Sequence, residues 1–235
     1  MKEIIEESFN NYLIHMTTVV KNYMKDAGYK RRRDQFIDFV NVFDSIEFPF
    51  DKLVTVETGV SQNYDDGLAG LLFGFATEKT NGKMFSVDID SNRLQKSSKI
   101  FSEVIPNLEY HIIQEDSVKF LSNLSVIPNL VHLDSWDLDL KNPFPSALHG
   151  WKEFMIIEPK MPSGSIILID DNFLKGTRVQ WNYSNGHSEN IDITYPIIGK
   201  GAHVYQHVLS GDSDWKLIGD HYKAGPNIKI MIQKK

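Results

Sequence analysis

Short runs of consecutive apolar residues recur along the chain, and acidic or polar residues follow each run at once. Such runs are typical of strands that are buried on both faces of a parallel sheet. They predict strands over residues 53–56, 84–87, 108–113, 130–133 and 166–169. Between them, apolar residues at spacings of three and four predict helices over 68–76, 91–104, 117–124 and around 151–157. This alternation predicts an α/β fold with a mostly parallel sheet flanked by helices.

The two ends of the chain follow other patterns. Residues 2–25 and 31–46 predict amphipathic helices that cover the sheet or the mouth of a site, or form a contact in a homo-oligomer. The segment 175–201 is rich in Gly, Asn, Ser and aromatic residues, which favours a long loop or hairpin insertion. Its residues Trp181, Tyr183 and His187 are candidates for substrate contact, with an interaction surface as an equal alternative. Strands are expected over 205–209, 215–222 and 228–233.

Charge and composition exclude several classes of protein. The formal net charge of -6 argues against a nucleic-acid backbone as the main partner, because neutralising phosphates needs a basic surface. The absence of cysteine excludes disulfides, thiolate metal sites and a cysteine nucleophile. No run approaches the ~18 apolar residues of a membrane span, and the first residues lack the apolar core of a signal peptide. We therefore expect a cytoplasmic protein without membrane contact, and we do not expect a nucleic acid as its partner.

The segment 53–90 carries the first candidate site. Its turn holds Glu57 and Gly59, and its second strand ends in Asp88. In open α/β sheets, ligands bind beyond the carboxyl ends of the strands, where an acidic residue holds the hydroxyl groups of a ribose. The turn lacks the glycines of a dinucleotide site, and Glu57 would repel a pyrophosphate. A cationic cofactor without phosphate therefore fits better, although a crossover with no ligand is also common.

These residues carry a resemblance to a known family. The run VETGVSQNYDDG followed by SVDID resembles motif I of class I S-adenosylmethionine-dependent methyltransferases, although Asn63 replaces a usual glycine. The resemblance implies that Glu57 and Gly59 border the amino acid part of the cofactor and that Asp88 holds the ribose. The segment IIQEDSVKFL is similar to the next family motif, which would place Asp116 and Ser117 near the adenine. Further candidate cofactor contacts are Ser61, Tyr64, Asp65, Ile89 and Asp134.

The resemblance also implies a more specific fold. It implies a Rossmann-like, seven-stranded, mostly parallel sheet with helices on both faces, closed by a C-terminal antiparallel hairpin. Residues 1–50 would then form N-terminal helices, and residues 51–235 would form the methyltransferase domain, within one compact domain overall.

A second cluster of carboxylates follows two later strands. In VHLDSWDLDL the strand ends at Asp134, and in SIILIDDN the strand ends at Asp170, Asp171 and Asn172. Adjacent parallel strands lie ~4.8 Å apart, so these side chains would lie within reach of one ion. Oxygen ligands of this kind suit Mg²⁺, Ca²⁺ or Mn²⁺ rather than zinc. The alternative is that the acids merely cap loops and helix starts, but unpaired like charges at one edge would repel one another.

These two runs are similar to the metal motifs of cation-dependent O-methyltransferases, of the catechol and caffeoyl-coenzyme A type. That match implies Asp134, Asp171 and Asn172 as ligands, and the macrocin and aminocoumarin sugar type would add Asp170. Neither type matches at its catalytic position. The lysine expected three residues after Asp134 is Asp137, and the aspartate expected two residues after it is Trp136.

Asp137 is therefore the candidate general base, with Asp139 in reserve. The function expected is O-methylation of a small hydroxylated acceptor, such as a sugar or catechol, assisted by a divalent cation. The alternatives are a metal-independent methyltransferase and a cofactor-binding protein with degenerate catalysis.

Overall fold

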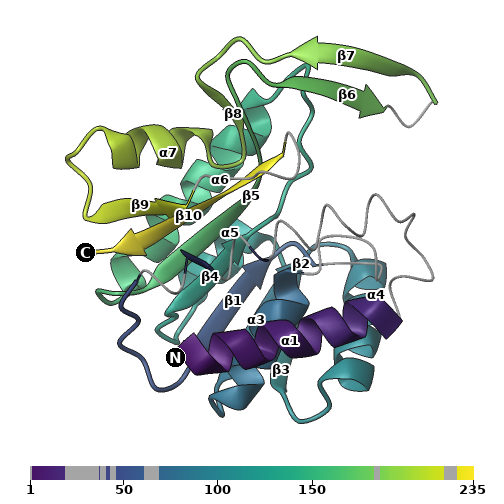
Figure 1. The fold of residues 1–235 in the computed structure, drawn as a ribbon, viewed down its shortest axis with the longest axis vertical. Helices are drawn as coiled ribbons and strands as arrows, with labels where there is room; N and C mark the ends of the chain where they lie inside the picture. Colours follow the sequence, from purple (N-terminus) through teal and green to yellow (C-terminus); the bar gives the residue numbers. More distant parts are fainter. Residues whose placement is uncertain are drawn as a thin grey trace.

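One twisted sheet forms the centre of the molecule (Figure 1). The computed structural model describes residues 2–18, 37, 41–42, 46–60, 69–182, 186–219 and 227–235, and every structural statement below concerns these residues. The strands lie in the order β3 (Glu109–Gln114), β2 (Lys83–Asp88), β1 (Val54–Thr58), β4 (Leu130–Leu133), β5 (Ile166–Leu174), β10 (Ile228–Lys234) and β9 (Trp215–Gly219). Strands β1 to β5 are parallel, whereas β10 runs antiparallel to both β5 and β9. The expected sheet and its C-terminal antiparallel hairpin are confirmed.

Helices cover both faces of this sheet, and each face has its own apolar core. On one face lie α1 (Lys2–Thr18), α3 (Ala69–Lys79) and α4 (Ser91–Val104). On the other lie α5 (Ser117–Asn123), α6 (Phe144–Ile157) and α7 (Ala202–Leu209), with the short helix η2 (Glu158–Lys160) after α6. Successive side chains of a strand point to opposite faces, so Ile166 and Leu168 join the first core while Ile167 and Ile169 join the second. Burial on both faces explains why these strands are apolar without alternation.

The N-terminal helix α1 is part of the first core. Its residues Ile5, Phe9 and Tyr12 are buried in the same cluster as α3, and Glu7 pairs with Lys79 of α3 at 2.6 Å. The expected continuation to residue 25 and the helix over 31–46 lie outside the described residues, apart from positions 37, 41 and 42. Within the described part of the chain, the helices are too short or too polar to cross a membrane.

The C-terminal third contains one wrong prediction. Residues 205–209 were expected to be a strand but belong to helix α7. This short pattern fits the period of a helix as well as that of a strand. In the structure Val204 and Val208, four residues apart on one helical face, are buried. The expected hairpin insertion is confirmed as β6 (Arg178–Asn182) and β7 (Ser188–Asp192), which project beyond the central sheet (Figure 1).

A small third core lies at the base of this hairpin. It contains Leu138, Phe173, Val179 and Ile198, with Trp181 packed against it. His187 is exposed near the hairpin end, and Tyr183 lies outside the described residues. After the hairpin, the short strand β8 (Ile197–Gly199) pairs with the outer end of β5 and returns the chain to the sheet.

Candidate functional site

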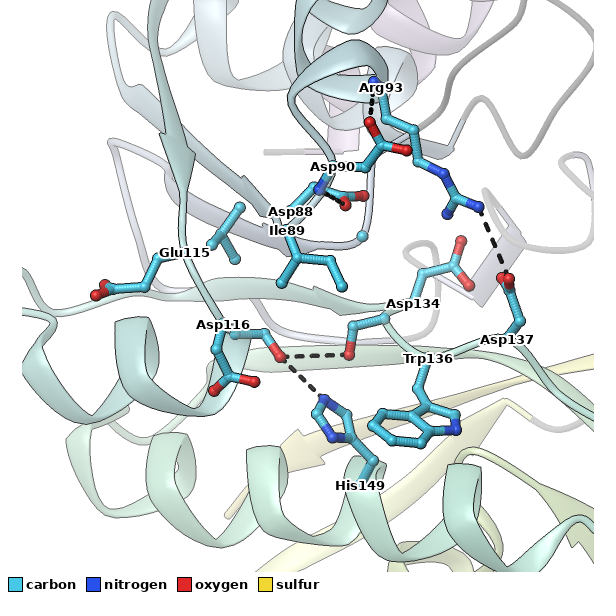
Figure 2. Close-up of a pocket in the computed structure, with 14 residues that line it drawn as sticks. Asp88, Ile89, Asp90, Arg93, Glu115, Asp116, Asp134, Trp136, Asp137 and His149 are labelled. Atoms are coloured by element: carbon cyan, nitrogen blue, oxygen red, sulfur yellow. Dashed lines mark hydrogen bonds and ion pairs between the residues drawn. The ribbon is translucent and has the colours of Figure 1, made fainter.

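A pocket opens at the carboxyl ends of the parallel strands, and Figure 2 shows its walls. The residues after β2, β3 and β4 contribute most of the lining, and α6 contributes His149. The predicted cofactor contacts Gly59, Asp88, Ile89, Asp116, Ser117 and Asp134 all line it. Of the other four, Ser61, Tyr64 and Asp65 lie outside the described residues, and Glu57 is described but does not line this pocket. Residues scattered over 76 positions of the sequence are thus brought together because parallel strands end at the same edge.

The pocket begins where the chain leaves β1 at Gly59. The φ angle of Gly59 is 76°, in the left-handed region that favours glycine. A Cβ atom at this position would lie 2.5 Å from the carbonyl oxygen of Asp134, which is too close. The amide of Gly59 donates to Val87 O at 2.9 Å, and the amide of Asp134 donates to Thr58 O at 2.9 Å. A glycine is therefore needed for the ends of β1 and β4 to meet at the pocket.

Asp88 is fixed at the tip of β2 by two backbone bonds. One carboxylate oxygen accepts from the amide of Val60 at 3.1 Å, and the other accepts from the amide of Asp90 at 2.8 Å. Each oxygen of an ionised carboxylate has a second acceptor site, so Asp88 retains capacity for two hydroxyl donors. Asp90 in turn caps α4 by accepting from the amide of Asn92 at 2.8 Å. The acid predicted to hold a ribose is therefore rigid and lines the pocket.

The opposite end of the pocket combines hydrogen-bonding groups with apolar surface. Asp116, labelled in Figure 2, caps α5, and Ser117 hydrogen bonds with His149 Nε2 at 3.0 Å. The rings of Trp136 and His149 lie 5.1 Å apart, and the side chains of Trp136 and Ile89 are exposed. Sequence reasoning missed His149, because nothing in its helix distinguishes it from a packing residue. Apolar faces beside a few polar groups are the usual lining of a small-molecule site.

Glu57, predicted to border the cofactor, does not line the described pocket. It is buried, accepts from Ser86 Oγ at 2.9 Å and lies 3.4 Å from His132 Nδ1. Gly70 of α3 packs directly against it, since a Cβ there would lie 2.4 Å from a Glu57 oxygen. The pleat of β1 turns its side chain toward the face covered by α3. Glu57 therefore belongs to the interior between the sheet and α3 rather than to the described pocket wall.

The residues of the second predicted cluster do lie together, and two lysines balance most of its charge. Lys200 Nζ lies 2.5 Å from Asp134 Oδ1 and 2.9 Å from Asp171 Oδ2. It also donates to the carbonyl oxygen of Asp134 at 3.0 Å, so all three of its protons have acceptors. Lys229 of β10 forms a buried ion pair with Asp170. The repulsion expected among the carboxylates is thus relieved by ammonium groups.

Asn172 is engaged by the backbone. Its side-chain amide donates to Ile169 O at 3.0 Å and to Asp170 O at 2.9 Å, and its side-chain oxygen accepts from the amide of Gly201 at 2.7 Å. The residue is fully buried. The side chain predicted to be a metal ligand therefore fixes the fold around the lysine.

A divalent ion does not fit this donor set. Ligand atoms of His132, Asp134 and Asp170 do lie within 4.8 Å of one another, and His132 Nε2 is buried without a hydrogen-bond partner in the described part of the chain. However, Asp134 and Asp170 each already hold an ammonium group, and a metal would have to displace both. In the described structure, ammonium groups therefore hold the carboxylates that a divalent ion would need.

Burial and the neighbouring charges set the protonation of the cluster. Burial raises the pKa of Asp134 to about 6, and Asp170 and Asp171 add to this while Lys200 opposes it. Burial would also raise the pKa of Asp170, but Lys229 and His132 hold it well below its usual range. Burial lowers the pKa of Lys200, yet Asp134 and Asp171 bring it above its ordinary value. Lys200 is therefore a permanent cation, whereas Asp134 titrates near neutrality.

The two predicted general bases are placed less favourably. Asp137 lines the rim of the pocket, where its side chain is 89% exposed and lies 3.7 Å from Arg93 (Figure 2). Asp139 is exposed, and its carboxylate accepts from the amide of Lys141 at 2.9 Å in a turn. Asp134 also lines the pocket, and unlike these two residues it is held in one orientation by Lys200.

Comparisons with known proteins identify the fold. No protein-family model matches the sequence, and no curated protein matches it either. NSun6 from Pyrococcus horikoshii, crystallised with SFG, is similar in structure with a TM-score of 0.53 and 11% identity, over 83% of this chain and 50% of that one. TrmN from Thermus thermophilus gives 0.51 and 8%, over 88% and 49%. An S-adenosylmethionine-dependent methyltransferase from Clostridium acetobutylicum gives 0.47 and 13%, over 96% and 98%.

The first two likenesses, with TM-scores above 0.5, bear on architecture. The chain spans about half the length of the first two structures. At identities this low they show the fold alone, which is the Rossmann-like sheet of strands and helices described above.

Proposed function

We propose that this protein is an S-adenosylmethionine-dependent methyltransferase that modifies a small hydroxylated acceptor, such as a sugar or a catechol, without a divalent cation. The observation that carries the proposal is the charge of the pocket. Six carboxylates line it, from Asp88, Asp90, Glu115, Asp116, Asp134 and Asp137, against the single described cation of Arg93. Such a lining attracts a cationic nucleoside and repels the phosphates of a dinucleotide.

The residues present fit each part of this cofactor. Asp88 offers both carboxylate oxygens to the ribose hydroxyls, and Asp116 and Ser117 offer polar groups to the adenine. Ile89 and Trp136 supply apolar surface for the flat base. When bound, the cofactor supplies a methyl group on a positively charged sulfur.

Asp134 has the properties of the general base in this reaction. It lines the pocket, and its pKa of about 6 leaves it largely ionised at neutral pH and still basic enough to accept a proton. Lys200 holds one of its oxygens in place. The acceptor oxygen bonds to the methyl carbon as the carbon–sulfur bond breaks, and the hydroxyl proton passes to Asp134. Correct orientation of the two reactants supplies much of the rate.

Calorimetry tests the cofactor proposal directly. S-adenosylhomocysteine and NADH are titrated separately into the wild type and the Asp88→Asn variant. We expect saturable heat from S-adenosylhomocysteine alone, and weaker binding in the variant by about tenfold or more because a charge-assisted hydrogen bond is lost. A folded sample that gives no heat with S-adenosylhomocysteine at millimolar levels would refute the proposal.

A methylation assay then separates catalysis from binding. Labelled S-adenosylmethionine is incubated with a panel of sugars, catechols, small metabolites and RNA, and transfer of the label is counted. Transfer to a small hydroxylated compound is the expected result. Binding without transfer to any compound would instead support a cofactor-binding protein, and transfer to RNA alone would contradict the acceptor class.

A further inference from the structure

The segment Gly199–Lys200–Gly201, between β8 and α7, is fitted closely around its lysine. Gly199 has a φ angle of 123°, and a Cβ atom there would lie 2.0 Å from Asp171 O. A Cβ atom on Gly201 would lie 2.6 Å from a methyl carbon of Ile230. From the other side, a Cβ atom on Gly150 of α6 would lie 2.3 Å from Lys200 O. Three glycines therefore allow the main chain at Lys200 to be held between β5 and α6.

Hydrogen bonds fix the same segment to β5. The amide of Lys200 donates to Asp171 O at 3.3 Å, and the amide of Gly201 donates to Asn172 Oδ1 at 2.7 Å. Asn172 is itself held by Ile169 O and Asp170 O. The strand end that the sequence predicts to bind a metal thus positions the lysine, and the side chain of Lys200 is only 4% exposed.

We propose that Lys200 is the built-in cation of this site, with its ammonium group in the position between Asp134 and Asp171 that the two acidic motifs predict for a divalent ion. The ammonium group pairs with both carboxylates and orients Asp134 toward the pocket. The role of Lys200 as the cation follows from its contacts with Asp134 and Asp171. Its role in orienting a catalytic Asp134 rests on the proposed function. The wild-type protein therefore has no divalent-ion site between these strands.

The charge balance predicts what happens when the lysine is removed. Asp134, Asp170 and Asp171 carry three negative charges, and Lys200 and Lys229 carry two positive ones. Without Lys200 the excess becomes two negative charges beside a gap lined by carboxylate oxygens. Oxygen ligands and an excess of two charges are what Mn²⁺ and Mg²⁺ require. The variant should therefore gain the metal site that the wild type lacks.

Titration with Mn²⁺, followed by the electron paramagnetic resonance of the free ion, tests this without the cofactor. We expect no saturable binding to the wild type and a gain in affinity of about tenfold or more in Lys200→Met. The double variant Lys200→Met with Asp134→Asn should lose that gain. Lys175 is an exposed lysine close in sequence to β5, and Lys175→Met, which removes the same charge, should behave as the wild type.

Several outcomes would overturn the proposal. One is stoichiometric binding of Mn²⁺ to the wild type that Asp134→Asn abolishes, and another is a folded Lys200→Met variant that gains no affinity. If Lys200→Met does not fold, the Mn²⁺ titration of the wild type still tests the proposal, which predicts no saturable binding. An assay in EDTA should also leave methyl transfer unchanged.

Two further measurements separate this proposal from the proposed function. Binding of S-adenosylhomocysteine to Lys200→Met should stay close to the wild-type affinity, since Lys200 does not line the described pocket. Its kcat should fall while KM for the cofactor is unchanged, and Lys200→Arg should recover part of kcat because it keeps the charge. If the wild type binds no S-adenosylhomocysteine, the proposed function fails while the Mn²⁺ result still tests Lys200.

Discussion

Replacing Lys229 by methionine should destabilise the protein strongly, by an amount that depends on pH. The side chains of Lys229 and Asp170 are 10% and 9% exposed and form a direct ion pair between β10 and β5. Removing one member of a buried pair leaves the other charge in a medium of low polarity, which typically costs about 3–5 kcal/mol. Asp170 keeps a hydrogen bond from the amide of Asp171 at 2.8 Å. We therefore expect a loss near the lower end, about 3 kcal/mol at pH 7.

The pH dependence follows from the pKa of Asp170. In the wild type this pKa is held well below its usual range, so the contribution of Asp170 to stability is constant between pH 5 and pH 7. Without Lys229, burial dominates and raises the folded-state pKa above the unfolded value of about 3.9. When folding raises the pKa of a group, the resulting stability is fully present at pH values below the pKa of that group in the unfolded state. It is lost as the pH rises through the pKa of the group in the folded state. The deficit of Lys229→Met should therefore be smaller at pH 5 than at pH 7.

Urea unfolding followed by circular dichroism measures this deficit at the two pH values. The matched control is the double variant Lys229→Met with Asp170→Leu, because an apolar pair of similar volume often replaces a buried ion pair without loss. The two single variants and the double variant form a cycle that isolates the interaction free energy. A loss below about 1 kcal/mol, the range of an exposed pair, or an equal loss at both pH values would refute this account of the cluster.

Three other predictions concern the pocket. Asp134→Asn should lower the rate of methyl transfer by about 10²–10⁴-fold while binding of S-adenosylhomocysteine, measured by calorimetry, persists. In the wild type, the rate should fall as pH drops below about 6, because Asp134 must be ionised to accept a proton; a flat profile down to pH 5 would contradict its role. Gly59→Ala should lower both Tm and cofactor affinity, since its Cβ would lie 2.5 Å from Asp134 O and overpacking costs about 1–3 kcal/mol. Gly176→Ala is the control, because Gly176 also has a positive φ, of 86°, but an added Cβ would have nothing within 4 Å. Its Tm should therefore fall through backbone strain alone. Equal effects of the two substitutions would argue against the contact between residue 59 and Asp134.

The central sheet could be predicted from the sequence because burial on both faces leaves a distinct pattern. The strand expected at 130–133 and the helix expected at 91–104 have those bounds in β4 and α4. The pattern failed where it was short, at Val204 and Val208, whose spacing suits a helix as well as a strand. Tertiary packing decides between helix and strand in such cases, and a short local pattern does not reveal that packing.

The sequence predicted that the acidic residues of the candidate site lie close together, but it did not predict the lysines that balance their charge. Parallel strands end at one edge, so the meeting of Asp88, Asp134 and Asp170 near that edge follows from topology. Their counter-ions follow no such rule. Lys200 lies 66 positions after Asp134, in a connection after a hairpin, and Lys229 lies 59 positions after Asp170, in an antiparallel strand. The glycines on both sides of Lys200 were the one local signal, since they indicate a main chain that is closely packed.

The position of the two lysines also bears on the order in which the chain becomes functional during synthesis. The five parallel strands and the pocket residues precede residue 175, whereas the positive charges come later in the sequence, from Lys200 and from Lys229 of β10. An incomplete chain on the ribosome can therefore pair its parallel strands but leaves their acidic ends mutually repelling. Insertion of β10 between β5 and β9 then joins β9 to the sheet and brings Lys229 to Asp170 in the same event.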